Sequence, residues 1–188
     1  MPHSHKGTEA HVCPWWLCPL FDNPLRRLLQ PPGKVLNSLV SAGQIALDLG
    51  CGMGYFTIPL AKLVGANGQV IAVDLQEQML AVVRRRARRA GVLERVRLHC
   101  GTLDSLAGEQ QVDFALACWM VHEVPDQAAL LSQVRSRLKP GGRFLLVEPL
   151  IHVDEVVFGK TVECARTAGL RPAYEWKVPL SRGMVLEA

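Results

Sequence analysis

The 188-residue sequence contains no run of about eighteen apolar residues, which is the length that a membrane-spanning helix requires. Residues 1–7 also lack the apolar core of a secretory signal. The six cysteines are scattered, and Cys51, Cys100 and Cys118 fall in predicted strands or turns, which indicates reduced thiols and not a disulfide framework. We therefore expect a cytoplasmic protein without a transmembrane segment, present as a monomer or a homodimer.

The chain also lacks a strong excess of either charge, since its formal net charge is +4. Much of that charge lies in Arg84-Arg85-Arg86-Ala87-Arg88-Arg89, where the arginines spread over more than half of a helix circumference and predict a solvated face. A nucleic-acid patch is the alternative, but there is no second basic run and no aromatic platform near these arginines. A nucleic-acid partner is therefore not expected.

A dense aromatic cluster lies near the start of the chain, in Cys13-Pro14-Trp15-Trp16-Leu17-Cys18-Pro19-Leu20-Phe21. A zinc site would recruit His11, Cys13 and Cys18, but no second ligand pair stands at zinc-finger spacing, so no metal is expected. We predict instead that Trp15 and Trp16 form a lid or a substrate-binding wall. Packing in the core or at an interface is the alternative.

Length and pattern predict one α/β domain, residues 1–188, of which residues 1–12 are expected to be disordered. Short apolar runs alternate with helical patterns, which predicts parallel strands joined by helical crossovers. The expected strands are 45–49, 70–74, 96–100, 113–118 and 143–148, with two more at 173–178 and 182–187 whose pairing the pattern does not reveal. Helices are expected to start at residue 22 and to occupy 34–40, 126–138 and 154–168, with a turn at 139–142.

The stretch from Ile45 to Phe56 carries the most informative pattern, a buried strand that ends in a turn with glycine at positions 50, 52 and 54. Glycine allows a sharp turn and lets a ligand touch the backbone, and the turn opens a helix whose free N–H groups face the same crevice. A dinucleotide fingerprint would need its third glycine at Tyr55, so a nicotinamide-dependent oxidoreductase is disfavoured. Asp48 suits a ligand with a positive amine, and Asp74, at the end of a second strand, has the spacing of a ribose-binding acid.

Asp48-Leu49-Gly50-Cys51-Gly52-Met53-Gly54, followed by Asp74, resembles motif I and the next acidic motif of the class I S-adenosylmethionine-dependent methyltransferases, of the small-molecule type. The resemblance runs from about Leu39 to the C-terminus and includes the L-K-P-G-G sequence at 138–142. It implies a three-layer Rossmann-like fold, whose seven-stranded sheet is mostly parallel with an antiparallel last strand. It also implies that residues 13–43 form a helical cap and residues 44–188 the cofactor-binding core.

S-adenosylmethionine is the implied cofactor, with S-adenosylhomocysteine as product. By the resemblance, Asp48 and the backbone of Gly50 and Gly52 would hold the methionine portion, and Asp74 would accept from the ribose hydroxyls, with capping of the next helix as the alternative. Where the family often has an aspartate for the adenine amine, this chain has Thr102, so Thr102, the Leu103 backbone or Asp104 would have to make that contact. The full expected cofactor set is Asp48, Gly50, Cys51, Gly52, Gly54, Asp74, Leu75, Met79, Thr102, Leu103, Ala117 and Cys118.

The segment after the fourth strand, residues 118–126, is expected to face the reactive methyl group. Trp119 and His122 would reach the acceptor, and His122 would be catalytic because its pKa range suits removal of a proton from a hydroxyl, thiol or carbon acid. A structural histidine is the alternative. The chain also lacks the N/D-P-P-Y/F motif of amino-group nucleic-acid methyltransferases.

These features predict a methyltransferase that acts on a small acceptor, apolar or aromatic, bound by Trp15, Trp16, Trp119 and His122. Two alternatives stay open. The first is a non-catalytic regulatory or assembly protein that binds the cofactor. The second, less favoured, is an RNA methyltransferase that uses the Arg84–Arg89 helix.

Overall fold

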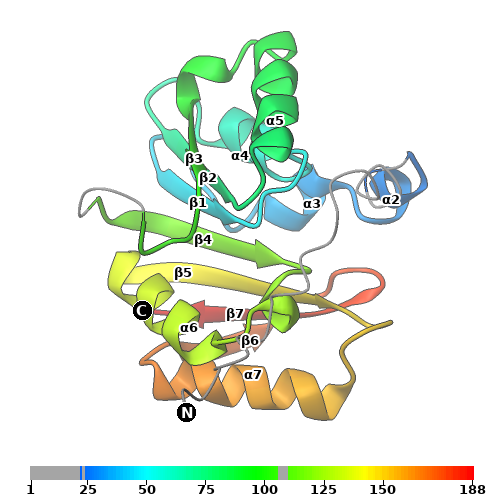
Figure 1. Ribbon diagram of the computed structural model, residues 1–188, viewed down its shortest axis with the longest axis vertical. Coiled ribbons are helices and arrows are strands. Elements are labelled where there is room, and N and C mark those ends of the chain that lie inside the picture. Colours follow the sequence, from blue (N-terminus) through cyan, green and yellow to red (C-terminus); the bar gives the residue numbers. More distant parts are fainter. Residues whose placement is uncertain (1–21, 23, 106–109) are drawn as a thin grey trace, which may run out of the picture.

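The computed structural model describes residues 22, 24–105 and 110–188, and within them seven strands form one sheet (Figure 1). The sheet order is β3-β2-β1-β4-β5-β7-β6. The first five strands are parallel, whereas β7 runs antiparallel to both β5 and β6, which confirms the predicted topology. The strand bounds are β1 (Ile45–Leu49), β2 (Gln69–Asp74), β3 (Val96–Cys100), β4 (Val112–Cys118), β5 (Leu138–Pro149), β6 (Arg171–Glu175) and β7 (Ser181–Glu187).

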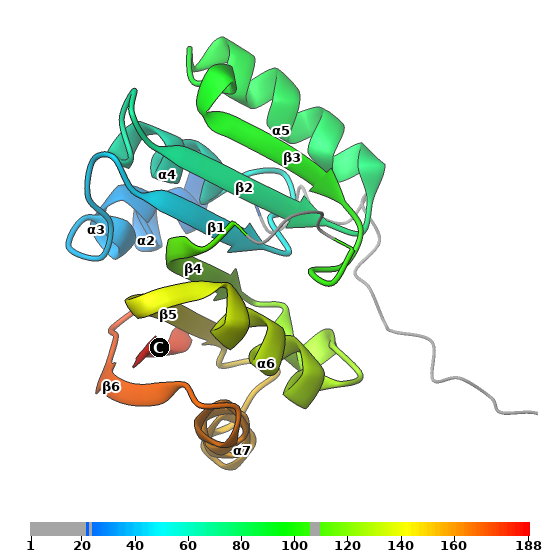
Figure 2. The same cartoon turned by 90° about the vertical axis from the view of Figure 1, so that its left-hand side faces the viewer.

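Helices cover both faces of the sheet and complete three layers (Figure 2). One face carries α3 (Pro32–Leu36), α4 (Thr57–Leu63) and α5 (Glu77–Arg89), and the other carries α6 (Gln127–Arg137) and α7 (Glu155–Thr167). The short α2 (Pro24–Leu29) precedes them, and η1 (Leu93–Arg95) and η2 (Val121–Glu123) are single 3₁₀ turns. Because both faces are covered, the central strands are apolar along almost their whole length instead of alternating.

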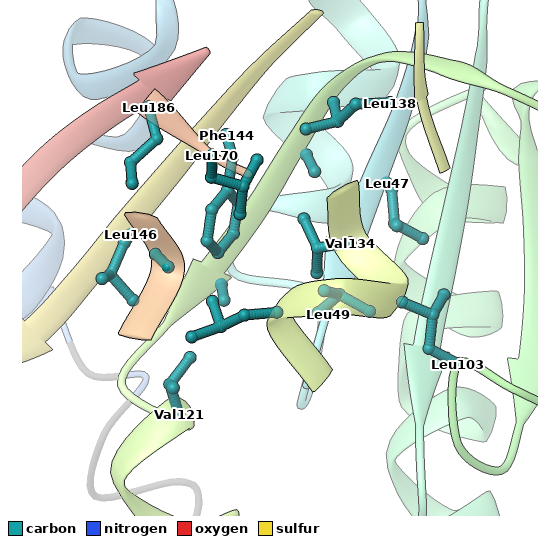
Figure 3. Packing of buried hydrophobic residues seen from close by; sticks show 14 of the residues in the cluster. Leu47, Leu49, Leu103, Val121, Val134, Leu138, Phe144, Leu146, Leu170 and Leu186 are labelled. Atoms are coloured by element: carbon teal, nitrogen blue, oxygen red, sulfur yellow. The ribbon is translucent and has the colours of Figure 1, made fainter. Parts of the chain in front are cut away.

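The core on the α6–α7 side of the sheet is built from alternate residues of neighbouring strands. Leu47 and Leu49 of β1 and Phe144 and Leu146 of β5 meet Val134 of α6 there (Figure 3). Each of these side chains is almost fully buried. Burial of one such leucine or phenylalanine contributes about 1.5–3 kcal/mol, so this packing fixes the strands and therefore the positions of their carboxyl ends.

Several predicted boundaries are wrong. The helix expected at 34–40 begins at Pro32 and ends at Leu36, because the fixed φ of proline suits the first helical turn, where its missing N–H is not needed. The turn expected at 139–142 lies inside the β4–β5 ladder, since β4 advances two residues from Val112 to Phe114 while β5 advances five from Leu138 to Arg143. The segment bulges out instead of ending the strand. β6 lies at 171–175 instead of the expected 173–178.

The predictions for residues 1–21, namely the disorder of 1–12, the Trp15–Trp16 wall and the disfavoured zinc ligands, lie outside the described residues. In the part of the chain that the structure describes, no helix has both the length and the apolar character needed to cross a membrane. The same residues contain no group of three or more His, Cys, Asp or Glu side chains placed to hold a metal ion.

Substitution of Gly183 tests the pairing of β6 with β7. A Cβ atom at position 183 would lie 2.3 Å from the backbone oxygen of Trp176, whose N–H donates to the Gly183 oxygen at 2.9 Å. Gly183→Ala should therefore lower the free energy of unfolding by about 1–3 kcal/mol, measured by urea denaturation. Gly159, inside α7 with nothing within 4 Å, is the control, and Gly159→Ala should raise stability by about 0.5–1 kcal/mol. Equal effects of the two changes would contradict this pairing.

Candidate active site

A cavity of about 530 Å³ opens at the carboxyl ends of the parallel strands. Its walls come from the glycine turn after β1 and from the segments after β2, β3, β4 and β5, together with Asp22 and Arg26 from the N-terminal part. The sheet order reverses between β1 and β4, and in open α/β sheets ligands bind at such a point. The fold therefore places most of the described site residues that the sequence predicted around one opening.

The three glycines of the turn have positive φ values of 61° at Gly50, 52° at Gly52 and 83° at Gly54, which residues with a Cβ atom rarely adopt. Their surroundings differ. A Cβ at Gly50 would lie 2.9 Å from Cγ of Met120, and one at Gly54 would lie 3.2 Å from Val83 of α5. A Cβ at Gly52 would meet nothing within 4 Å, and Gly52 lines the cavity. Gly52 is thus the position where a side chain would take up ligand space.

Asp74 joins the ends of β1 and β2. One of its carboxylate oxygens accepts the Gly52 N–H at 2.8 Å, and the other accepts the Gln76 N–H at 2.9 Å. Burial raises the pKa of Asp74, while these backbone hydrogen bonds act in the opposite direction. The helix-capping alternative does not describe it, because Gln76 occupies the N-cap position of α5. Asp74 lines the cavity, as a ribose-binding acid would have to do.

Asp48 is 3 % exposed, and the hydroxyl of Thr57 donates to its carboxylate at 2.6 Å. Burial raises the pKa of Asp48 from its ordinary 3.8 to about 7, and the negative charge of Asp74 adds to the rise. Asp48 also lines the cavity. A buried carboxyl of this kind is ready to ionise when a cation arrives beside it.

Arg86 braces the same turn from α5. Its Nη1 donates to the backbone oxygen of Met53 at 2.9 Å and forms an ion pair with Asp22. The Arg86 side chain is 28 % exposed, whereas Arg84 and Arg85 are exposed residues. One arginine of the basic segment therefore contacts the glycine turn and is only partly exposed.

Another side of the cavity is closed by the rings of Tyr55 and Trp119, which we call the aromatic wall, and by the Arg26 side chain that packs on them. The Arg26 guanidinium carbon lies 3.9 Å from the Trp119 ring centroid and 4.3 Å from that of Tyr55. Trp119 has a φ of 62°, which is uncommon for a bulky residue, and its indole N–H donates to Ser181 at 2.9 Å. The surrounding contacts hold the indole in a strained backbone position, as is frequent at functional sites.

His122 lies in η2, and its Nδ1 atom is 2.5 Å from a carboxylate oxygen of Glu148. The other Glu148 oxygen accepts the Val121 N–H at 2.9 Å, and the Glu148 side chain is 1 % exposed. The hydrogen bond to Glu148 raises the pKa of His122, although burial opposes the rise. The His152 ring stacks on His122 with centroids 5.9 Å apart, and both histidines line the cavity.

The segment after β3 differs from the family pattern as the sequence predicted. The Thr102 hydroxyl donates to Asp104 two residues later, and this bond lowers the pKa of Asp104. Thr102, Leu103 and Asp104 all line the cavity. The Thr102 hydroxyl is already engaged, so Asp104 is the stronger candidate for an amine contact.

Comparison with known proteins decides the family. Residues 46–142, just over half of the chain, match the family model described as a methyltransferase domain. The chain belongs to the class I S-adenosylmethionine-dependent methyltransferases. The fold agrees: a SAM-dependent methyltransferase from Aquifex aeolicus superposes with a TM-score of 0.82 over 94 % of this chain and 99 % of that one, at 24 % sequence identity.

The chain is also similar to curated relatives. It is 36 % identical over 110 residues to the demethylmenaquinone methyltransferase of Bacillus cytotoxicus, which covers 58 % of this chain and 46 % of the relative. It is 31 % identical over 115 residues to a ubiquinone/menaquinone biosynthesis C-methyltransferase of a Marinomonas species, which covers 61 % of this chain and 46 % of the relative. The chain thus spans less than half the length of these two relatives.

Two residues predicted to bind the cofactor do not line the cavity. Ala117 is fully buried in the core on the α6–α7 side, because side chains alternate along β4 and Cys118 points the other way. Gly54 packs against Val83 instead of facing the ligand space. The predicted residues that do line it are Asp48, Gly50, Cys51, Gly52, Asp74, Leu75, Met79, Thr102, Leu103, Cys118, Trp119 and His122.

Sequence reasoning missed Arg26, Tyr55, Glu148 and His152. Glu148 could have been found, because it is an acid near the end of a buried strand, the same signal that singled out Asp48 and Asp74. No local pattern marks Arg26, since its contacts with Tyr55 and Trp119 arise only when α2 packs against the sheet end.

Asp48 makes the stability of the protein depend on pH. The folded-state pKa of Asp48, about 7, lies above the ordinary value of 3.8. The stability that protonated Asp48 contributes is therefore fully present below pH 3.8 and is lost progressively as the pH rises to about 7. Asp48→Asn removes the ionisation and can still accept from Thr57. Its Tm should exceed that of the wild type by about 2–6 °C at alkaline pH. Thermal unfolding followed by circular dichroism should show this gain shrinking toward pH 4, and a gain that is constant with pH would contradict the assignment.

Proposed function

We propose that this protein transfers the methyl group of S-adenosylmethionine to a small apolar or aromatic acceptor. The observation that carries the proposal is a single cavity with two chemically different sides. One side has two buried carboxylates around a glycine turn, and the other has the Trp119 ring against the Arg26 guanidinium and a stacked pair of histidines, His122 and His152.

The carboxylate side suits the cofactor part by part. Asp48 would face the α-ammonium group, while the backbone of Gly50 and Gly52 would approach the methionine portion without a Cβ in the way. Asp74 would accept from the ribose hydroxyls, and Leu75 and Met79 would flank the adenine. Asp104 is assigned to the adenine amine, and the other cofactor contacts are assigned to Cys51, Thr102, Leu103 and Cys118, all of which line the cavity.

The aromatic side suits the acceptor. Trp119 and Tyr55 offer ring surface, and the exposed Ile151 adds an aliphatic side chain to the cavity lining. Two relatives are named for methylation of demethylmenaquinone or for a C-methylation in quinone biosynthesis, which supports a quinol-like aromatic acceptor here. Trp15 and Trp16 stay assigned to the acceptor by the sequence prediction.

Methyl transfer from a sulfonium is an in-line displacement in which the leaving group is already cationic. The protein therefore has mainly to align the two partners and exclude water, and such alignment supplies a large part of a rate acceleration. Burial raises the pKa of Cys118 to about 12, so its thiol stays protonated and does not compete with the acceptor as a nucleophile.

Two alternatives receive less support. An RNA substrate would use the basic segment of α5, but Arg86 there is engaged with Asp22 and the Met53 backbone. A regulatory protein would need the cofactor pocket but no acceptor side. A turnover measurement distinguishes such a regulatory protein from an enzyme. Label from methyl-labelled S-adenosylmethionine should enter a naphthoquinol or a naphthol. Intact cofactor binding without any transfer to this panel would favour the regulatory alternative.

Substitution at Gly52 tests the cofactor side. Gly52→Val should leave a folded protein but fill the ligand space, so S-adenosylhomocysteine should no longer raise its Tm. The wild type should gain about 2–3 kcal/mol of stability at a ligand concentration of about a hundred times the Kd. Differential scanning fluorimetry measures the Tm of the variant and of the wild type with and without this ligand.

Gly91→Val is the matched control, because Gly91 also has a positive φ and no atom within 4 Å of its Cβ position, yet lies outside the cavity. It should carry the same backbone strain and keep the full ligand response. A normal response of Gly52→Val would contradict the proposed cofactor geometry.

A further inference from the structure

We propose that His122, positioned by Glu148, takes a proton from a hydroxyl group of the acceptor, so that the acceptor is a neutral phenol-type or enol-type weak acid. This inference rests on the proposed methyl transfer and narrows its substrate class. It also assigns a positioning role to Glu148, for which the sequence predicted no function.

The Glu148 carboxylate is hydrogen-bonded to two residues of the same turn, η2. Both of its carboxylate oxygens are used by η2, one by the Val121 N–H at 2.9 Å and the other by His122 Nδ1 at 2.5 Å. A carboxylate that is 1 % exposed is costly to bury unless its partners compensate the charge. The bond to Nδ1 places the proton of the neutral imidazole on that nitrogen, which leaves the lone pair on Nε2.

The opposite edge of the His122 ring is available for an acceptor. The side chain is 22 % exposed and lines the cavity, while Nδ1 is turned to the buried Glu148. Among the described residues, none makes a hydrogen bond to Nε2. His152 packs on the face of the ring, with planes 20° apart, and so limits the rotation of the ring without occupying that edge.

The position of η2 brings this edge close to the expected reaction centre. Met120, directly before η2, packs over Gly50 so closely that a Cβ there would be 2.9 Å from it. Gly50 belongs to the turn assigned to the methionine portion of the cofactor. Trp119, on the other side of Met120, forms the aromatic wall. The base, the aromatic surface and the methyl donor would therefore meet around one short segment.

The step balances as follows. The acceptor O–H bond breaks and its proton goes to Nε2 of His122, while the resulting anion supplies the electron pair for the new bond to the methyl carbon. The methyl–sulfur bond breaks with its electron pair going to sulfur, which gives S-adenosylhomocysteine. The imidazolium that forms is stabilised by the Glu148 carboxylate. Whether methyl ends on oxygen or on a ring carbon of the same anion is read from the product.

The groups that face His122 are Glu148 from β5, Glu123 from its own turn and His152 from the loop after β5, with Asp126 on the same wall. Glu148 and Glu123 both favour the charged imidazolium. The reaction needs the neutral form, so kcat should rise with pH through the raised pKa of His122. Glu148→Gln should move this rise to lower pH and also lower the plateau, because the imidazolium loses its counter-charge.

The experiment measures methyl transfer from labelled S-adenosylmethionine to naphthols whose hydroxyl acidity is tuned by substituents. His122→Gln should reduce kcat by about 10²–10⁴-fold for weakly acidic naphthols, the usual size of a general-base effect. The defect should shrink for a nitro-substituted naphthol, which is already ionised. His99→Gln, at a partly exposed histidine of β3 outside the cavity, is the matched control and should keep wild-type rates.

Equal loss across the series would overturn the proton transfer, and so would transfer to naphthylamines alone. A second measurement does not depend on turnover. Nitrogen-15 NMR of the S-adenosylhomocysteine complex above the His122 pKa should show the proton on Nδ1 and a free Nε2, and the reverse tautomer would also overturn the inference. Failure of S-adenosylhomocysteine to bind would instead count against the proposed function.

Discussion

The hydrogen bond from the Gly52 N–H to the Asp74 carboxylate is the contact on which the rest of this site depends. It joins the turn after β1 to the end of β2 at 2.8 Å, next to a backbone bond from Cys51 to Val73. The turn can reach Asp74 only because its glycines adopt positive φ values. Arg86 of α5 then holds the far side of the turn through Met53. Three elements thus fix one short loop, and the cavity takes its shape from it.

The same arrangement concentrates negative charge where water is scarce. Asp48 and Asp74 are both at least nine-tenths buried, and the negative charge of Asp74 adds to the cost of ionising Asp48. Such a pair destabilises the empty protein and favours a cationic ligand, since a positive group restores the charge balance. S-adenosylmethionine carries an ammonium group and a sulfonium centre. The stability lost at the site is thereby linked to the affinity gained for the cofactor.

Sequence reasoning was accurate where chemistry is local. The alternation of apolar runs predicted five parallel strands, and the acid–glycine pattern selected Asp48, Gly52 and Asp74, which line one cavity, because turn geometry and strand ends leave a direct mark on sequence. It was less accurate where packing decides. Ala117 and Cys118 are neighbours, and only the pleat of β4 determines that Cys118 faces the cavity. Arg26 has no local sequence signal, and its contacts with Tyr55 and Trp119 exist only in the folded protein.

The central claim is that a cationic cofactor binds against a carboxyl group, Asp48, that is partly protonated in the empty protein. Isothermal titration calorimetry with S-adenosylhomocysteine, at about pH 6 and about pH 8 in buffers of different ionisation enthalpy, tests it most directly. The account predicts binding at both pH values, with release of close to one proton at the lower pH and much less at the higher. Absence of binding, or binding without proton release at either pH, would contradict it.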